Sequence, residues 1–248
     1  SAPRLLAVVI FFTAAIAMGR GVLGFETVPP EGTATISAPL LSNATSVGVP
    51  GVDATPADDG ASGGVVATSP TPLPIGIVSG HWGSDSGAVC DGDLYEVDVN
   101  LRIAELVVGQ LQDLGYTVDL LEEFDERLTG YRALALVSIH ADSCLYPEAT
   151  GFKVAHVVDS AVPELEDLLV DCLTDRYGAR TGLAFHEGSI TPDMLYYHNF
   201  YEIDPETPGA IIEVGFMLAD RDILLTQPEL VAQGIVDGIE CFLEQTGH

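Results

Sequence analysis

The chain has 248 residues, of which 37 are Asp or Glu and only 9 are Lys or Arg, so its formal net charge is −28. The length suits one domain of ordinary size with appendages. The acidic balance argues against nucleic acid as a partner, because binding a phosphate backbone needs clustered Lys and Arg, and it argues equally against adhesion to anionic lipid.

The first predicted element is an uncharged, apolar stretch at residues 5–19. As a helix it would be roughly 22 Å long, shorter than the roughly 30 Å hydrocarbon core of a membrane. This length and the small-residue sequence Ala15-Ile16-Ala17 fit a secretory signal peptide, whereas extension past Arg20 would make an uncleaved membrane anchor. We expect residues 1–25 to be one of these two. The protein would then be exported, facing the cell wall or tethered outside the cytoplasmic membrane, with no other membrane contact.

Residues 26–73 are rich in Gly, Ala, Ser, Thr and Pro and keep no lasting helical or strand period. Such a composition is typical of a disordered linker. A coil of this length spans roughly 40 Å on average, so it would hold a domain away from a membrane while letting it search. We therefore place the folded domain at residues 74–248.

Apolar runs alternate with amphipathic segments throughout this domain. They predict strands at 75–80, 116–121, 134–141, 151–158 and 210–216, and helices at 93–115, 163–178 and 228–247. The second helix has a proline at its start, and Gly178 is predicted to end it. Strands that alternate with helices indicate an α/β domain whose sheet is covered on both faces. In open sheets of this kind, functional sites form at the carboxyl ends of the strands.

Three of the predicted strands carry a histidine or a glutamate at or near their carboxyl end, namely His81, His140 and Glu213. A fourth candidate, Glu96, lies near the start of the first helix. Two histidines and one carboxylate are the protein ligands of a catalytic zinc site that keeps one position open for water. A further carboxylate beside that water can act as a general base.

Each of these residues also has an ordinary structural interpretation. A single histidine at a strand end is usually structural, and Glu96 alone would be a solvated residue of a first helical turn. Glu213 differs, because a buried carboxylate needs a metal, a cation or a raised pKa. Residue types and spacing therefore indicate a metal hydrolase as one of several possibilities.

Four short motifs occur in order over about residues 75–243. They are Gly80-His81-Trp82-Gly83 with Asp85-Ser86-Gly87-Ala88, Glu96 with Asn100, Ser138-Ile139-His140-Ala141, and Glu213-Val214-Gly215-Phe216. In these motifs the chain resembles the zinc-dependent N-acetylmuramoyl-L-alanine amidases of the type-3 class, which are cell-wall hydrolases. The chain departs from the family pattern at Val78-Ser79, where Asp-Pro is usual, at Trp82, and in a shortened helix before Ser138.

The resemblance implies a role for each matching residue. His81, Glu96 and His140 would bind zinc, and Glu213 would be the catalytic carboxylate. The implied fold is a single three-layer α/β/α domain with a mixed, mostly parallel sheet. The implied reaction is hydrolysis of the amide between N-acetylmuramic acid and the L-alanine of the peptidoglycan stem peptide by zinc-activated water.

Two alternatives remain open at this point. One is a related zinc hydrolase of another acyl-amino-acid or peptide amide. The other is a non-catalytic module that binds glycan or peptide, although a pure binder has no need of Glu213. The sequence does not indicate an oligomeric state. His186 and His198 lie in a stretch that matches the family loosely; they are further candidates for the site, with ordinary surface or strand histidines as the alternative.

The four cysteines fit an exported protein, in which an even number permits disulfides. Cys90 and Cys144 follow the two strands that carry histidines, so both would lie on loops at the same sheet edge, and we predict a disulfide between them. Cys172 and Cys241 fall on two predicted helices, where a disulfide and free buried thiols are both open.

Overall fold

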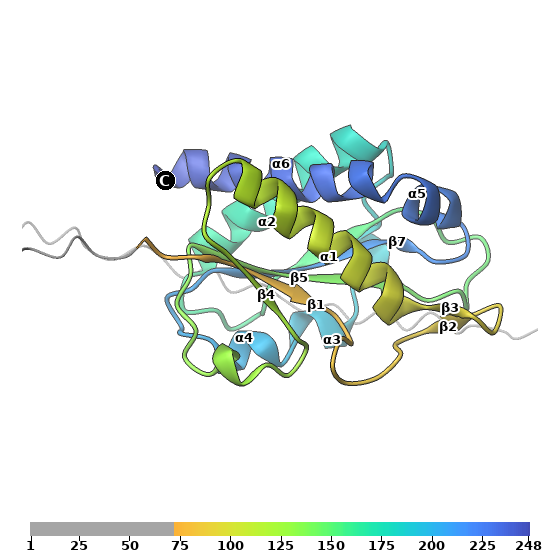
Figure 1. The fold of residues 1–248 in the computed structure, drawn as a ribbon, viewed down its shortest axis with the longest axis horizontal. Coiled ribbons are helices and arrows are strands. Elements are labelled where there is room, and N and C mark those ends of the chain that lie inside the picture. Colours follow the sequence, from red (N-terminus) through yellow and green to blue (C-terminus); the bar gives the residue numbers. More distant parts are fainter. Residues whose placement is uncertain (1–71) are drawn as a thin grey trace, which may run out of the picture. The chain divides into compact units, whose positions relative to one another are not determined.

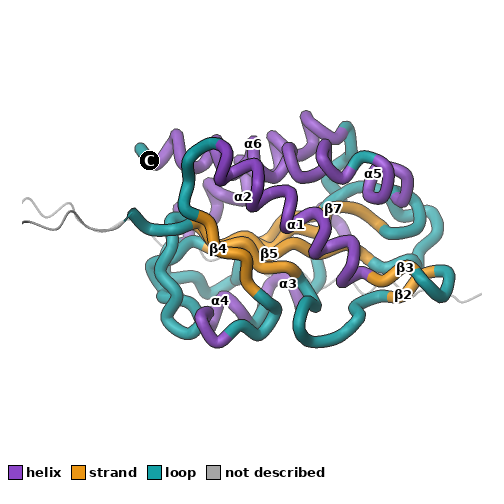
Figure 2. Tube along the Cα trace, in the orientation of Figure 1, coloured by secondary structure: helices purple, strands orange, loops and turns teal. Residues whose placement is uncertain are grey.

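The computed structural model describes residues 72–248, so the predicted signal or anchor segment and nearly all of the predicted linker lie outside the described residues. Within them, five strands form one sheet in the order β4-β1-β5-β7-β6 (Figures 1 and 2). Their bounds are β1 Ile75–Ser79, β4 Val118–Leu121, β5 Ala135–Asp142, β6 Lys153–Ala155 and β7 Gly209–Phe216. Only β6 pairs antiparallel with its neighbour, which confirms the expected mixed, mostly parallel sheet.

The helices form two unequal layers around this sheet (Figure 1). Three long helices cover one face: α1 (Glu96–Asp113), α2 (Pro163–Thr181) and α6 (Pro228–Thr246). The other face carries short elements: a 3₁₀ turn at Glu126–Leu128, α3 (Pro192–Leu195) and α4 (Asn199–Glu202). A second 3₁₀ turn at Glu187–Ser189 precedes α3, and α5 (Arg221–Thr226) follows β7. The three-layer arrangement is therefore confirmed, with the long helices all on one side.

Alternate residues of the strands pack into two separate hydrophobic clusters. Ile75 and Ile77 of β1 join the large cluster under the long helices, whereas Val78 joins a smaller cluster on the opposite face. Side chains of a strand point alternately to the two faces of a sheet, so a strand buried on both faces needs apolar residues at consecutive positions. This explains why the strands appear in the sequence as unbroken apolar runs.

Several predicted boundaries were wrong; the strand predicted at 151–158, for example, forms only at Lys153–Ala155. The helix predicted to end at Gly178 continues to Thr181, and Gly182 ends it with φ +74°. Gly178 instead lies inside α2, where an added Cβ would contact the Phe152 ring at 3.4 Å. The helix predicted from residue 93 begins at Glu96, because Leu94–Tyr95 form β3, which pairs with β2 at Val89–Cys90.

Two disulfides link distant parts of the domain. Cys90 in β2 pairs with Cys144 after β5, which confirms the predicted bridge. Cys172 of α2 pairs with Cys241 of α6, which decides the alternative that the sequence left open. Between residues 72 and 248, no helix is both long and apolar enough to span a bilayer.

Candidate metal centre

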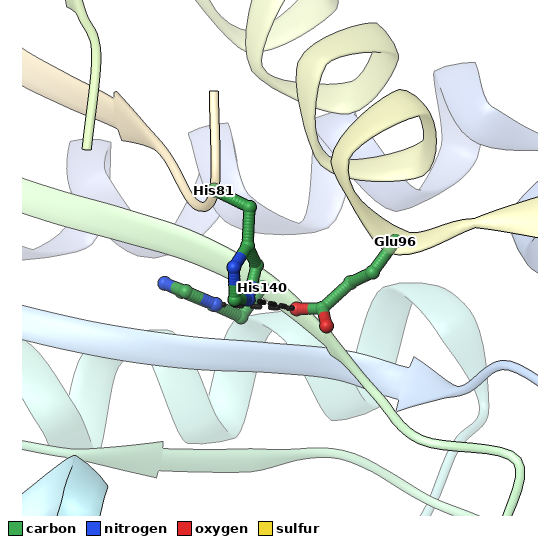
Figure 3. Close-up of side chains that lie close together, drawn as sticks. All are labelled: His81, Glu96 and His140. Carbon is green, nitrogen blue, oxygen red and sulfur yellow. Dashed lines mark hydrogen bonds and ion pairs between the residues drawn. The ribbon is translucent and has the colours of Figure 1, made fainter. Parts of the chain in front are cut away.

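The carboxyl edge of the sheet brings His81, Glu96 and His140 together (Figure 3). His81 follows β1, His140 lies in β5, and Glu96 is the first residue of α1. One donor atom of each lies within 4.8 Å of the other two. Nε2 of His81 and Nδ1 of His140 are each 3.2 Å from Oε1 of Glu96. Ligands of a tetrahedral zinc ion, at bond lengths of about 2.0–2.1 Å, lie roughly 3.3 Å apart, so these donors and their spacing fit such an ion.

Two glycines leave the space that the three side chains occupy. A Cβ at Gly80 would lie 2.4 Å from the His140 ring, closer than any carbon can approach. Gly87 has φ +60°, and a Cβ there would lie 2.6 Å from Oε2 of Glu96. Gly80 is therefore required for close approach, and Gly87 both for close approach and for its backbone conformation. The Gly-His and Asp-x-Gly parts of the sequence motif thus have a steric reason.

His81 itself has an uncommon backbone conformation, with φ +66°. A left-handed conformation is unfavourable for a residue with a Cβ and persists where surrounding contacts hold it. Here the backbone N–H of His81 donates to Oε2 of Glu123 at 2.7 Å. This bond fixes the turn that directs the imidazole ring toward Glu96.

The ring nitrogen of His81 that does not face Glu96 has its own partner. Nδ1 of His81 lies 2.7 Å from Oδ1 of Asp85, and the same oxygen accepts the Gly87 N–H at 2.7 Å. The carboxylate of Glu96 accepts the Ala88 N–H at 2.9 Å through its second oxygen. Histidines that bind metal commonly donate their other N–H to a carboxylate, which fixes the tautomer and the ring orientation.

His140 meets a second buried carboxylate on its other side. Its Nε2 is 3.3 Å from the Tyr197 hydroxyl and 3.7 Å from Oε2 of Glu123. Tyr197 donates to Oε1 of Glu123 at 2.8 Å and accepts from the Ser138 hydroxyl at 2.9 Å. Nε2 of His198 also lies 2.8 Å from Oε1 of Glu123. Glu123 therefore links His140, Tyr197 and His198 and, through the backbone, His81.

The charges of these groups support one another. The hydrogen bond to Glu96 raises the pKa of His81 to about 9. Burial opposes the charged form of Glu96, but its hydrogen bonds with His140 and His81 hold its pKa well below the usual range. Burial likewise opposes a charged Glu123, yet the His198 hydrogen bond and the His140 charge lower its pKa to about 2. Two ionised carboxylates thus surround the imidazoles, an environment that favours a cation.

Glu213 lies in the wall of a cavity of about 360 Å³ that also exposes His81, Glu96 and His140. It is paired with His140 in the register between β5 and β7. Burial raises the pKa of Glu213 to about 7. Its Oε2 atom is buried and has no hydrogen-bond partner among residues 72–248. A buried acceptor without a partner is costly, and this oxygen is free to accept a hydrogen bond.

The structure thus brings together all four residues that the sequence singled out. Of the two further histidines, His186 bonds to Ser189 and does not line the cavity, whereas His198 reaches the site through Glu123. Sequence reasoning missed Glu123 and Tyr197. Glu123 follows a predicted strand at the same sheet edge, so the strand-end rule that found His81 would have found it; nothing local marks Tyr197.

This donor set of two histidines and one carboxylate, with a further carboxylate, Glu213, in the same cavity, fits a metal-dependent hydrolase. The family model described as N-acetylmuramoyl-L-alanine amidase matches residues 75–241. The chain belongs to this family. By class it is therefore a peptidoglycan amidase, a hydrolase of the cell wall.

Individual relatives support the assignment to different extents. The AmiC amidase of Neisseria meningitidis serogroup B is 38% identical over 84 residues, which are 30% of this chain and 20% of AmiC, so the match spans about a fifth of that relative. The AmiC2 amidase of Nostoc punctiforme is 26% identical with a TM-score of 0.52, and the match covers 69% of this chain and 97% of AmiC2. The Ami1 amidase of Mycobacterium smegmatis shares the fold, with 20% identity, a TM-score of 0.58, and coverage of 71% of this chain and 100% of Ami1.

Proposed function

We propose that the domain cleaves the amide between N-acetylmuramic acid and L-alanine of the stem peptide, with zinc held by His81, Glu96 and His140. The observation that carries the proposal is the convergence of these three donors beside Glu213 in one cavity, and zinc dependence is typical of the family. A zinc ion bound there would lower the pKa of a water molecule toward 7 and polarise the scissile carbonyl.

In this mechanism Glu213 moves the proton. Its carboxylate accepts a proton from the attacking water and later donates it to the leaving amine of L-alanine. The pKa of about 7, which follows from burial, allows both transfers near neutral pH. The free Oε2 atom is the acceptor, since it has no competing partner among the described residues. Asp85 and Glu123 hold the two imidazole rings in orientation.

Mass spectrometry of digested peptidoglycan tests the proposal. We expect released stem peptides with a free L-alanine amino group, glycan strands with a free lactyl carboxyl, loss of both after chelation, and recovery when zinc is added back. Cleavage at another amide would instead indicate a related hydrolase of acyl-amino-acid or peptide amides. Binding without cleavage by the zinc-loaded protein would indicate a glycan- or peptide-binding module.

We further propose that the protein is exported, that residues 1–25 direct or anchor it, and that residues 26–73 tether the catalytic domain of residues 74–248. The cell-wall substrate of the family supports export, and the uncharged stretch at 5–19 supports a signal or anchor. Cell fractionation with amino-terminal sequencing tests this. Cleavage near residue 17 indicates a signal peptide, an intact start in the membrane fraction indicates an anchor, and cytoplasmic protein contradicts the proposal.

A further inference from the structure

The cavity beside Glu213 contains the only lysine in the 248 residues, Lys153. The side chain of Lys153 is 3% exposed. By contrast, the arginines that form ion pairs in the described domain are 36–61% exposed. The surface thus uses arginine for its few positive charges, and the single lysine lies in the wall of the site.

The contacts of Lys153 leave part of its hydrogen-bonding capacity unused. Its Nζ lies 2.5 Å from Oδ2 of Asp142 and 3.3 Å from the carbonyl oxygen of Ser189. An ammonium group has three N–H donors; the described residues supply two oxygen acceptors, and the Phe216 ring centroid lies 5.5 Å from Nζ. Lys153 is directly opposite Glu213 in the antiparallel pairing of β6 with β7, so both side chains lie on the same face of the sheet.

Burial of an ammonium group costs free energy, which its ion pair with Asp142 offsets only in part. A buried ion pair often contributes less to stability than apolar side chains of the same volume would. The other charged groups in the cavity wall are acidic or imidazole, namely Glu96, Glu123, Asp142, Asp193 and Glu213 with His81 and His140. Apart from the metal centre, Lys153 is therefore the one cationic side chain in this cavity wall that can donate to an anionic group of a substrate, and Asp142 offsets part of its charge.

We propose that Lys153 binds the α-carboxylate of the residue that follows L-alanine in the stem peptide, and so makes the domain selective for substrates in which this carboxylate is free. This inference rests on the proposed amidase function. The carboxylate belongs to the peptide side, because the lactyl carboxyl of N-acetylmuramic acid is already part of the amide. The residue after L-alanine is the nearest place for such a group.

Two muramoyl dipeptides that differ in one group test the proposal: N-acetylmuramoyl-L-alanyl-D-glutamate and N-acetylmuramoyl-L-alanyl-D-isoglutamine, in which an amide replaces the α-carboxylate. The zinc-loaded protein should prefer the carboxylate form roughly 10- to 100-fold in kcat/KM, mostly through KM, as expected for a charged hydrogen bond. Lys153→Gln should bring the ratio close to one. Arg102→Gln, which removes a positive charge from the exposed surface of α1, should keep it.

Other outcomes overturn the proposal. A ratio near one in the unaltered protein, or an equal loss on both substrates in Lys153→Gln, would mean that Lys153 acts on the fold or on the reacting carbonyl. If Lys153→Gln is unstable because Asp142 loses its partner, the double variant Lys153→Met, Asp142→Asn removes both charges and gives the same comparison.

A binding measurement separates this proposal from the amidase function. Calorimetric titration with L-alanyl-D-glutamate and L-alanyl-D-isoglutamine needs no turnover. If neither muramoyl dipeptide is cleaved, the amidase function fails, while tighter binding of the carboxylate peptide that Lys153→Gln abolishes would still support the subsite. Equal binding of both peptides would reject the subsite even in an active amidase.

Discussion

Each histidine of the proposed metal centre uses its two ring nitrogens differently. One nitrogen of each faces Glu96, and the other faces Asp85 in the case of His81, or the Tyr197 hydroxyl and Glu123 in the case of His140. A hydrogen bond on one nitrogen decides which tautomer is present and hence whether the other can bind metal. The zinc affinity of the site should therefore depend on side chains that are not ligands.

Replacing Glu123 tests this dependence. Glu123→Gln should lower zinc affinity roughly 10- to 100-fold, the range typical of partners behind metal ligands, because it removes the charge next to His140. Competition with a zinc-binding dye measures the effect. Glu122→Gln makes the same chemical change one residue earlier, at an exposed position, and should leave affinity unchanged. If both variants bind zinc with equal affinity, Glu123 does not contribute to the metal centre.

Zinc binding should also release protons. The pKa of His81 is raised from 6.5 to about 9 in the metal-free protein, so this imidazole is protonated at pH 7. Metal binding needs the neutral ring, so uptake of zinc at pH 7 should release at least one proton, and affinity should rise with pH up to about 9. Calorimetry in buffers of different ionisation enthalpy measures the release. A binding enthalpy that is independent of the buffer would contradict it.

The role of Glu213 can be separated from metal binding. Glu213→Gln should keep zinc and the melting temperature while it loses roughly 10²–10⁴-fold in kcat, because the amide cannot accept the proton. Glu206→Gln, on the exposed surface, is the matched control and should keep full turnover. If Glu213→Gln cleaves muropeptides at nearly the normal rate, Glu213 is not the base. If it instead loses stability and keeps kcat, Glu213 anchors the strand.

At the scale of elements, the sequence predicted the parts that have a strong periodic or apolar pattern. All five strands of the large sheet and the three long helices were found, because burial on both faces requires unbroken apolar runs and burial of one helical face requires a 3.6-residue period. The helices α3 and α4 have four residues each, too few to show a period. Nor does a helical period indicate which face of the sheet a helix covers, so the asymmetry of the two layers was not predictable.

Less of the site than of the fold could be predicted from the sequence alone. Their positions at strand ends identified His81, His140 and Glu213 as candidates. The assignment of Glu96 as a metal ligand depended on the family resemblance. Tyr197 lies in a segment of short helices with no pattern of its own, and its hydroxyl reaches Ser138 and Glu123 only through tertiary packing. Contacts between residues more than 50 positions apart cannot be predicted from the local sequence pattern.

The turn between β1 and α1 gives a prediction at this scale. Gly80→Ala should weaken zinc binding and lower the melting temperature, because the new methyl group would lie 2.4 Å from the His140 ring and push it out of the cluster. Gly109→Ala, in α1, has no atom within 4 Å of its new methyl group and should stabilise the domain by up to about 1 kcal/mol. Unchanged zinc affinity in Gly80→Ala would show that the ring does not need this space.

At the scale of the whole domain, the two disulfides make different connections. Cys90–Cys144 joins segments that follow the proposed ligands His81 and His140, whereas Cys172–Cys241 joins α2 to α6. Each should stabilise the fold by roughly 2–4 kcal/mol, mainly by restricting the unfolded chain. Their contributions to the metal centre should differ, because only the first lies beside it.

Paired substitutions to alanine test this difference. Removing either bridge should lower the free energy of unfolding measured with denaturant by roughly 2–4 kcal/mol. Only the Cys90→Ala, Cys144→Ala variant should also lose zinc affinity, and the other pair serves as its control. Equal zinc affinities in the two variants would contradict a bracing role for Cys90–Cys144, and four titratable thiols in the denatured, unreduced protein would contradict both bridges.

The position of Lys153 has a practical consequence for chemical labelling. Because this residue supplies the only side-chain amine in the sequence and is almost wholly buried, reagents that couple to amines should leave the surface of the folded domain unmodified. Slow acetylation of Lys153 would therefore report how often its amine becomes exposed. The rate of modification at this one position records how often the wall of the site opens to solvent, without any engineered probe.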